Sequence, residues 1–193
     1  MEIVESPDGI SVFCGSRIGY HKSYFEAGRQ LGKSLGRAGI RIVYGGGSQG
    51  IMGTLADAAL EAGGEVVGVI PRFMVDREWA HPGISKLHIV DSLHQRKEIM
   101  LQASQYLIAL PGGFGTLEEL TEVLSWAQLN LHHKQIFLAN ISNFYDKLLS
   151  FLDDCVKQGF TDTHHRQLLT CIAGVDELIS TLSELEPNWK HLA

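Results

Sequence analysis

Short, uninterrupted apolar segments alternate with amphipathic segments along most of this 193-residue chain. The apolar segments are rich in β-branched residues, as in Val66-Val67-Gly68-Val69-Ile70. An uninterrupted apolar strand is typical of burial on both faces, whereas a half-exposed strand alternates polar and apolar residues. Covered strands that alternate with helices form a parallel, doubly wound sheet. We therefore predict a Rossmann-like α/β fold of about seven strands, with helices on both faces.

The alternation places each element along the chain. The predicted strands are residues 10–14, 41–44, 65–70, 87–90, 106–110, 135–139 and 169–172, and the predicted helices are residues 24–37, 51–62, 93–103, 116–129, 144–157 and 175–183. The length and a hydrophobic content of 45% suit one domain over residues 1–193, with its core at about 10–183. Residues 71–85 form a long irregular stretch with Arg77, Glu78 and Trp79, and we interpret it as a binding loop.

Ligands of doubly wound sheets bind outside the carboxyl ends of the strands. Three predicted strands are followed there by glycine-containing or polar segments. These are Cys14-Gly15-Ser16-Arg17, Gly45-Gly46-Gly47-Ser48-Gln49-Gly50 and Pro111-Gly112-Gly113-Phe114-Gly115. We expect the three segments to share one crevice.

The last of these segments has the layout of a phosphate cradle. Gly112, Gly113 and Gly115 let backbone N–H groups approach an anion, and the helix predicted to begin at Thr116 adds unpaired donors and a partial positive charge. Two carboxylates, Glu118 and Glu119, follow in the first turn. A carboxylate this close to a bound phosphate would repel it unless it points at the sugar or the scissile bond, so one of the two is a candidate for chemistry.

A structural interpretation competes with the cradle. Thr116 and Glu119 match the capping box, in which each residue caps the other's backbone at a helix start. A capping box needs no glycine run, and each unneeded glycine costs about 1 kcal/mol. The glycines therefore favour the anion site.

The segment Gly45-x-Gly47-x-x-Gly50 matches the dinucleotide fingerprint in form. That fingerprint also requires an acidic residue after the next strand, which here ends Gly68-Val69-Ile70-Pro71 without a carboxylate. A nucleotide with one phosphate fits the chain better than NAD does.

Adjacent positive charges, Arg96 and Lys97, lie on the helix before the cradle strand. Such a pair is commonly a solvated helix face. Leu93, Met100 and Ala103 mark the buried stripe of this helix, however, and Arg96 falls within the stripe. Because a buried arginine without an anionic partner is costly, we expect Arg96 to face the crevice.

Composition excludes several classes of protein. A net charge of −6 disfavours nucleic acid and anionic membrane surfaces as partners. Three cysteines without a C-x-x-C pair encode neither a disulfide framework nor a thiolate zinc site, and this indicates a cytoplasmic protein. No apolar run approaches 18 residues, and the acidic first residues lack a signal-peptide core. The adjacent histidine pairs do not suit a metal, so we expect no metal site.

The motifs resemble those of the Lonely Guy family of cytokinin riboside 5′-monophosphate phosphoribohydrolases, formerly labelled lysine decarboxylases. The signature P-G-G-x-G-T-x-x-E is met from Pro111 to Glu119, and its companion R-K pair by Arg96-Lys97. The resemblance runs from about Ser11 to Ser180. Phe114 stands where many members have Tyr, and Leu93 where many have Met.

This resemblance implies hydrolysis of the N-glycosidic bond of an adenosine 5′-monophosphate, often N6-prenylated, to the free base and ribose 5-phosphate. It implies a homodimer with active sites near the interface and no cofactor. Glu119 suits the stabilisation of positive charge on the ribose, and Arg96 the stabilisation of the departing base. The substrate-binding residues expected beside them are Ser16, Gly46, Glu78, Lys97, Gly112, Gly113, Phe114, Gly115, Thr116, Leu117, Glu118 and Ser125.

Two other functions compete with this one. Proteins that carry the molybdenum cofactor resemble the family in fold, but a carrier needs the cradle without both Arg96 and Glu119. A lysine decarboxylase needs pyridoxal phosphate on a lysine, and no motif here provides that site. The joint presence of the two reactive side chains favours the hydrolase.

Overall fold

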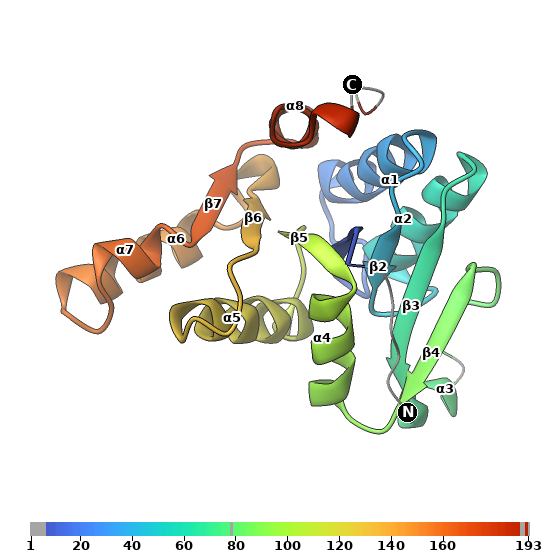
Figure 1. Ribbon diagram of the computed structural model, residues 1–193, viewed down its shortest axis with the longest axis horizontal. Coiled ribbons are helices and arrows are strands. Elements are labelled where there is room, and N and C mark those ends of the chain that lie inside the picture. The colour runs from blue at the N-terminus through green and yellow to red at the C-terminus, as the bar shows by residue number, and fades with distance from the viewer. Residues whose placement is uncertain (1–6, 78, 190–191, 193) are drawn as a thin grey trace.

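The fold is a seven-stranded, all-parallel sheet in the order β4-β3-β2-β1-β5-β6-β7, as predicted (Figure 1). It is seen in a computed structural model that describes residues 7–77, 79–189 and 192. The strands are β1 (Gly9–Phe13), β2 (Ile42–Tyr44), β3 (Val66–Pro71), β4 (Lys86–Val90), β5 (Ser104–Ala109), β6 (Gln135–Ala139) and β7 (Leu169–Ile172). Each lies within two residues of its predicted bounds.

Eight α-helices and two short 3-10 helices connect or follow the strands within the described residues. They are α1 (Lys22–Arg37), α2 (Gly50–Glu61), α3 (Arg72–Val75), α4 (Leu93–Gln102), α5 (Phe114–Gln128), η1 (Ile141–Asn143), α6 (Asp146–Lys157), α7 (Thr163–Arg166), α8 (Val175–Leu185) and η2 (Pro187–Trp189). The sequence pattern missed α3 and α7, because four residues are too few to show a helical period.

Two hydrophobic cores lie on opposite faces of the sheet. Helices α1, α2 and α8 pack on one face, where Ile10 and Val12 of β1 point. Helices α4 and α5 pack on the other face, where Phe13 points, and α6 adds partly buried leucines there. Successive side chains of a strand point to opposite faces, so a strand covered on both sides must be apolar throughout. The continuous apolar segments follow from this arrangement.

Helices α1 and α2 approach each other closely at glycine. A Cβ atom added to Gly32 of α1 would lie 2.2 Å from the backbone oxygen of Leu55 of α2. No side chain fits there, and this contact holds the two helices side by side on their face of the sheet.

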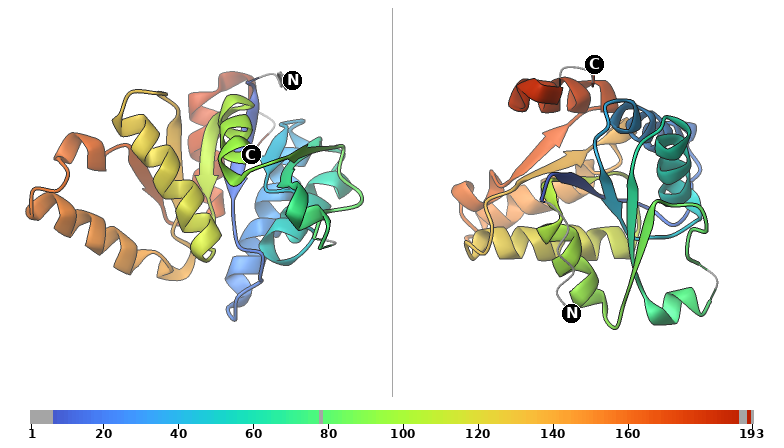
Figure 2. Two further views of the ribbon diagram at one scale, coloured as in Figure 1. Left: turned by 90° about the horizontal axis from the view of Figure 1, so that it is seen from below. Right: turned by 45° about the vertical axis from the view of Figure 1, so that its right-hand side comes forward.

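Three predicted helix starts differ from the structure by two residues. Helix α1 begins at Lys22 instead of 24. Helix α5 begins at Phe114 instead of 116, because Gly113 is already its N-cap residue. Helix α6 begins at Asp146 instead of 144, after the 3-10 turn η1 in which Ser142 has a positive φ of 51°. Helices α6 and α7 project beyond the β7 edge of the sheet in both further views (Figure 2).

The order of the strands fixes where a ligand site can form. The chain runs from β1 outward to β4, and then returns to place β5 on the other side of β1. The connections after β1 and β5 therefore leave toward opposite faces, and a crevice opens between them at the carboxyl ends. Among the described residues, no helix is both long and apolar enough to cross a membrane.

Candidate active site

A cavity of about 700 Å³ lies at the carboxyl ends of the central strands. The three segments expected to share one crevice all contribute to it. Its polar lining residues include Ser16, Arg17, Gln49, Arg96, Lys97, Thr116, Glu118 and Glu119, and its apolar ones Cys14, Met52, Ile70, Met74, Trp79, Leu93 and Phe114. Burial raises the pKa of the Cys14 thiol, which keeps it protonated.

The first turn of α5 is open toward this cavity. Leu117 N–H donates to the Gly113 carbonyl at 3.0 Å and starts the helical ladder. The N–H groups of Phe114, Gly115 and Thr116 have no hydrogen-bond acceptor among residues 7–77, 79–189 and 192. The capping box of Thr116 and Glu119 does not form, because Gly113 is the N-cap residue and no side chain caps the helix. Open donors at a helix start are suited to binding an anion.

The first turn of α2 differs, although its loop is also rich in glycine. The N–H groups of Ile51 and Met52 both donate to the Gly15 carbonyl, at 3.0 and 3.3 Å. Gly50 has φ +67°, and a Cβ atom there would lie 2.3 Å from Ser16 C and Arg17 N. Protein backbone thus occupies the place that a pyrophosphate takes in a dinucleotide site.

A buried ion pair crosses the cavity wall. Arg96 Nη2 of α4 lies 2.6 Å from Glu119 Oε1 of α5, and these side chains are 9% and 8% exposed. The pair depends on Gly45, because a Cβ atom there would lie 2.0 Å from Arg96 Nη2. Burial raises the pKa of Glu119, while the charge of Arg96 acts in the opposite direction.

The neighbouring cation, Lys97, is also buried and ion-paired. Its Nζ atom contacts the carboxylates of Glu118 and Glu122 on α5. Burial by itself lowers the pKa of Lys97, but the hydrogen bonds and charges of these carboxylates raise it above its usual value. The solvated-face interpretation of Arg96-Lys97 is therefore wrong. The predicted stripe needs a correction as well, because Leu93 is 40% exposed at the cavity rim.

The predicted binding loop reaches the cavity through Met74 and Trp79. Backbone hydrogen bonds hold the loop in place: Ser48 N–H donates to the Trp79 carbonyl at 3.0 Å, and His81 N–H donates to the Gly46 carbonyl at 2.9 Å. With Met52 and Ile70, these side chains give the cavity an apolar end. Of these four residues, Trp79 was expected from its place in the binding loop. The other three could not be predicted, because an apolar residue facing a cavity has the same sequence pattern as one facing the core.

The cavity does not contain every residue expected to bind substrate. Ser16, Lys97, Gly113, Phe114, Gly115, Thr116 and Glu118 line it with Arg96 and Glu119, whereas Gly46, Gly112, Leu117 and Ser125 do not. Leu117 packs against the core on the α4 and α5 face. Ser125 is exposed and donates to the Thr121 carbonyl at 2.8 Å. Glu78 lies outside the described residues. Arg17 lines the cavity without having been assigned a role.

Comparison with known proteins gives a consistent result. The profile of a family described as "possible lysine decarboxylase" matches residues 52–182. Cytokinin riboside 5′-monophosphate phosphoribohydrolase LOG4 of Arabidopsis thaliana is 44% identical over 184 residues, which are 95% of this chain and 86% of the relative. The corresponding enzyme LOG of Oryza sativa subsp. japonica is 42% identical over 181 residues, which are 94% of this chain and 75% of the relative.

Solved structures of molybdenum cofactor proteins share the fold. The Moco carrier protein of Chlamydomonas reinhardtii has a TM-score of 0.69 at 22% identity, and covers 94% of this chain and 98% of its own. The molybdenum cofactor binding protein of Rippkaea orientalis has a TM-score of 0.68 at 17% identity, with 95% and 99% covered. At these identities the likeness is one of fold alone.

The ion pair leads to a prediction about stability. We expect Arg96→Ala to lower the free energy of unfolding by about 3 kcal/mol at neutral pH, because it leaves the buried Glu119 carboxylate without its cation. Loss of the cation raises the pKa of Glu119 further, so the folded state binds the proton more tightly than the unfolded chain. Stability then falls as pH rises, and the loss shrinks as pH is lowered toward the ordinary carboxyl pKa of about 4.3.

Urea unfolding at neutral and mildly acidic pH measures this loss relative to the unsubstituted protein. The double variant Arg96→Ala/Glu119→Gln is the control, and it should recover most of the stability. An equal loss in both variants at every pH would show that the pair is not the cause.

Proposed function

Because the chain belongs to the Lonely Guy family of cytokinin riboside 5′-monophosphate phosphoribohydrolases, we propose that it hydrolyses the N-glycosidic bond of adenosine 5′-monophosphate-type nucleotides. The products are the free base, a cytokinin where the base is N6-prenylated, and ribose 5-phosphate. One observation carries the proposal: the Arg96–Glu119 pair and the open first turn of α5 face the same cavity. A phosphate on that turn places the ribose against the pair.

Glu119 acts on the ribose. Breaking the bond between C1′ and the base leaves positive charge on the sugar, which a carboxylate in a water-poor site stabilises. Attack of water at C1′ then forms the new C–O bond, and Glu119 takes the released proton. Its raised pKa suits it to this step, since a base works best when its pKa approaches the working pH.

Arg96 acts on the departing base. One of its nitrogens is bound to Glu119, whereas Nε is buried without a hydrogen-bond partner among the described residues. A buried donor without an acceptor is rare and costly in a folded protein. A ring nitrogen of the leaving base accepts this hydrogen bond as negative charge develops on it. The proton that Glu119 takes from water then passes to the base, so that the neutral free base leaves and the carboxylate is restored.

The decarboxylase label of the family does not fit this cavity. Pyridoxal phosphate chemistry needs a lysine whose amine is neutral when it reacts. Lys97 is the only lysine that lines the cavity within the described part of the chain, and its pKa is raised by two carboxylates. This chain is a hydrolase and not a lysine decarboxylase.

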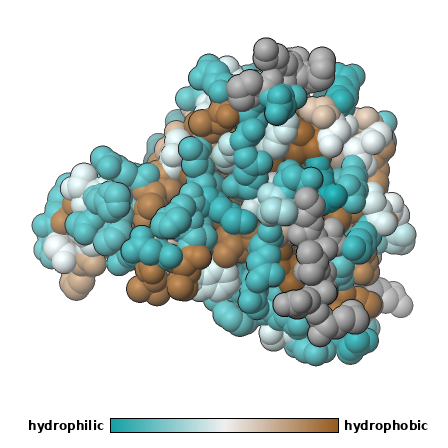
Figure 3. Space-filling model, viewed as in Figure 1, coloured by the Kyte–Doolittle hydropathy of each residue, from teal (hydrophilic) through white to brown (hydrophobic). Residues whose placement is uncertain are grey.

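We also propose that residues 1–193 act as one domain and that the protein forms a homodimer through the exposed face of α5. Large apolar side chains are exposed just beyond this helix, where Leu129 is 67% and Leu131 is 68% exposed. Hydrophobic residues gather over the end of α5 and over α6 at the lower left edge of the molecule (Figure 3). Ser125 lies one turn before Leu129 on the same face, so this dimer would place it at or near the interface.

We further propose a cytoplasmic location, in keeping with three cysteines that are all free. Cell fractionation tests this location, and recovery in a membrane or secreted fraction would count against it.

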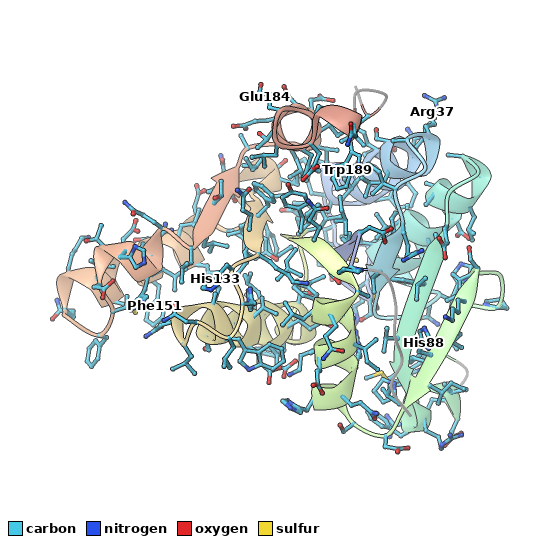
Figure 4. The ribbon with its side chains drawn as sticks, in the orientation of Figure 1. Arg37, His88, His133, Phe151, Glu184 and Trp189 are labelled. Carbon is cyan, nitrogen blue, oxygen red and sulfur yellow. The ribbon has the colours of Figure 1, made fainter. Side chains whose placement is uncertain are left out.

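We expect Glu119→Gln to lower turnover of AMP at least about 100-fold, the usual scale for loss of a preorganised electrostatic group. The variant should still fold but unfold at a lower temperature, because the amide keeps the shape of the carboxylate but leaves the buried Arg96 guanidinium without its anion. Glu184→Gln is the control, since Glu184 is exposed on α8 at the upper edge of the molecule, away from the cavity (Figure 4). Full turnover in the Glu119 variant would remove this residue from the mechanism.

Nucleoside 5′-monophosphates should be hydrolysed at least about 100-fold faster, by kcat/KM, than the unphosphorylated nucleosides. Two charged hydrogen bonds to the phosphate, at about 1.5 to 3 kcal/mol each, are enough to produce a preference of this size. Chromatography of the bases released from AMP, an N6-prenylated AMP and adenosine measures this preference. Equal rates for AMP and adenosine would contradict the assignment of the cradle to phosphate.

Light scattering should give a mass about twice 21.3 kDa. The double variant Leu129→Asp/Leu131→Asp should be a monomer with reduced turnover, because charges in a buried apolar interface are costly. Phe160→Asp is the control, since Phe160 is 84% exposed beyond the end of α6. A monomeric unsubstituted protein with full turnover would rule the dimer out.

A further inference from the structure

The segment that carries Arg17 lies against the phosphate cradle. It follows β1, and Gly15 N–H donates to the Pro111 carbonyl at 3.1 Å, which ties this segment to the cradle segment. A Cβ atom on Gly15 would lie 3.0 Å from the Arg17 oxygen and 3.3 Å from Gly112 Cα. The two backbones are thus in close contact, and Arg17 lines the same cavity as the first turn of α5.

The backbone that carries Arg17 is held on a second side by α2. The Gly15 carbonyl accepts the N–H groups of Ile51 and Met52, and Gly50 leaves no room between this segment and the helix. The exposed Arg17 side chain therefore starts from a position fixed by two elements of the fold.

The charges of the cavity leave Arg17 without a partner. The other two cations that line the cavity are each paired with carboxylates, Arg96 with Glu119 and Lys97 with Glu118. Arg17 forms no ion pair or hydrogen bond with the residues that the structure describes. An arginine stays charged at any physiological pH, so the cavity keeps one unneutralised positive charge beside its open backbone donors.

We propose that Arg17 binds the 5′-phosphate of the substrate together with the N–H groups of Phe114, Gly115 and Thr116. The inference rests on the proposed function and adds to it the residue that recognises the charge of the phosphate. The planar guanidinium donates two parallel hydrogen bonds to phosphate oxygens, whereas the backbone donors supply shape and partial charge. Recognition of the phosphate is thereby separated from the Arg96–Glu119 pair, which acts at the other end of the ribose.

Isothermal calorimetry with ribose 5-phosphate and with adenine tests the proposal, because neither titration depends on catalysis. Arg17→Ala should weaken ribose 5-phosphate binding about 10- to 100-fold, the range for loss of a charged hydrogen bond, and leave adenine binding unchanged. Arg17→Lys should recover part of the affinity, since an ammonium keeps the charge but not the bidentate geometry. Arg37→Ala is the matched control, because Arg37 projects from α1 into solvent at the upper edge (Figure 4).

The outcomes separate this inference from the proposed function. Unchanged ribose 5-phosphate binding in Arg17→Ala overturns the role of Arg17, and the hydrolase assignment stands if the unsubstituted protein still releases adenine from AMP. Equal weakening toward ribose 5-phosphate and adenine indicates a structural role and also overturns the inference. If the unsubstituted protein binds ribose 5-phosphate through Arg17 but hydrolyses no nucleotide, the proposed function fails and the phosphate site remains.

Discussion

The contact between Arg96 and Glu119 imposes the strictest demands on the site. Two charges removed from water cost several kcal/mol each, and their attraction offsets this only in good geometry. The 2.6 Å distance meets that demand, and Gly45 leaves the space in which the guanidinium lies. Helices α4 and α5 must therefore keep their relative position to within a few tenths of an ångström. An ion pair that contributes little net stability to the fold is better explained by a role in binding a ligand or in its reaction.

The charges of the cavity follow a simple rule. Arg96 is paired with Glu119 and Lys97 with Glu118, so that the charges of these side chains largely offset one another. Among the described residues that line the cavity, Arg17 is the one unpaired cation, and it shares the cavity with the free donors of α5, where a phosphate would bring negative charge. The net charge of −6 over the whole chain does not oppose this, because salt largely screens surface charges that are farther away than about 8 to 10 Å, whereas Arg17 would contact the phosphate directly.

Much of the fold could be predicted from the sequence, and the reasons are visible in particular elements. The strand Val66–Pro71 is apolar throughout because helices cover both of its faces, so its pattern has one interpretation. The start of α5 was placed two residues late because glycine is a poor helix former, and the sequence does not show that Gly113 is already the N-cap residue, with Gly115 inside the first turn. The pairing of Lys97 with Glu118 and Glu122 could not be predicted from the sequence either, because it depends on how α4 and α5 pack against each other.

The two glycine-rich loops differ in what glycine does for the helix that follows: one loop leaves the N–H donors of the first turn occupied, and the other leaves them free. After β2, the positive φ of Gly50 lets α2 reach the Gly15 carbonyl, and a neighbouring strand end consumes the donors of its first turn. After β5, Gly113 and Gly115 have open space where a Cβ atom would be, and the donors of α5 remain free. A dinucleotide brings two phosphates to one helix start, whereas this crevice has one free helix start and one free cation. That arrangement supports a ligand with a single phosphate, and it arises because the loop after β1 fills the place beside α2 with its own backbone.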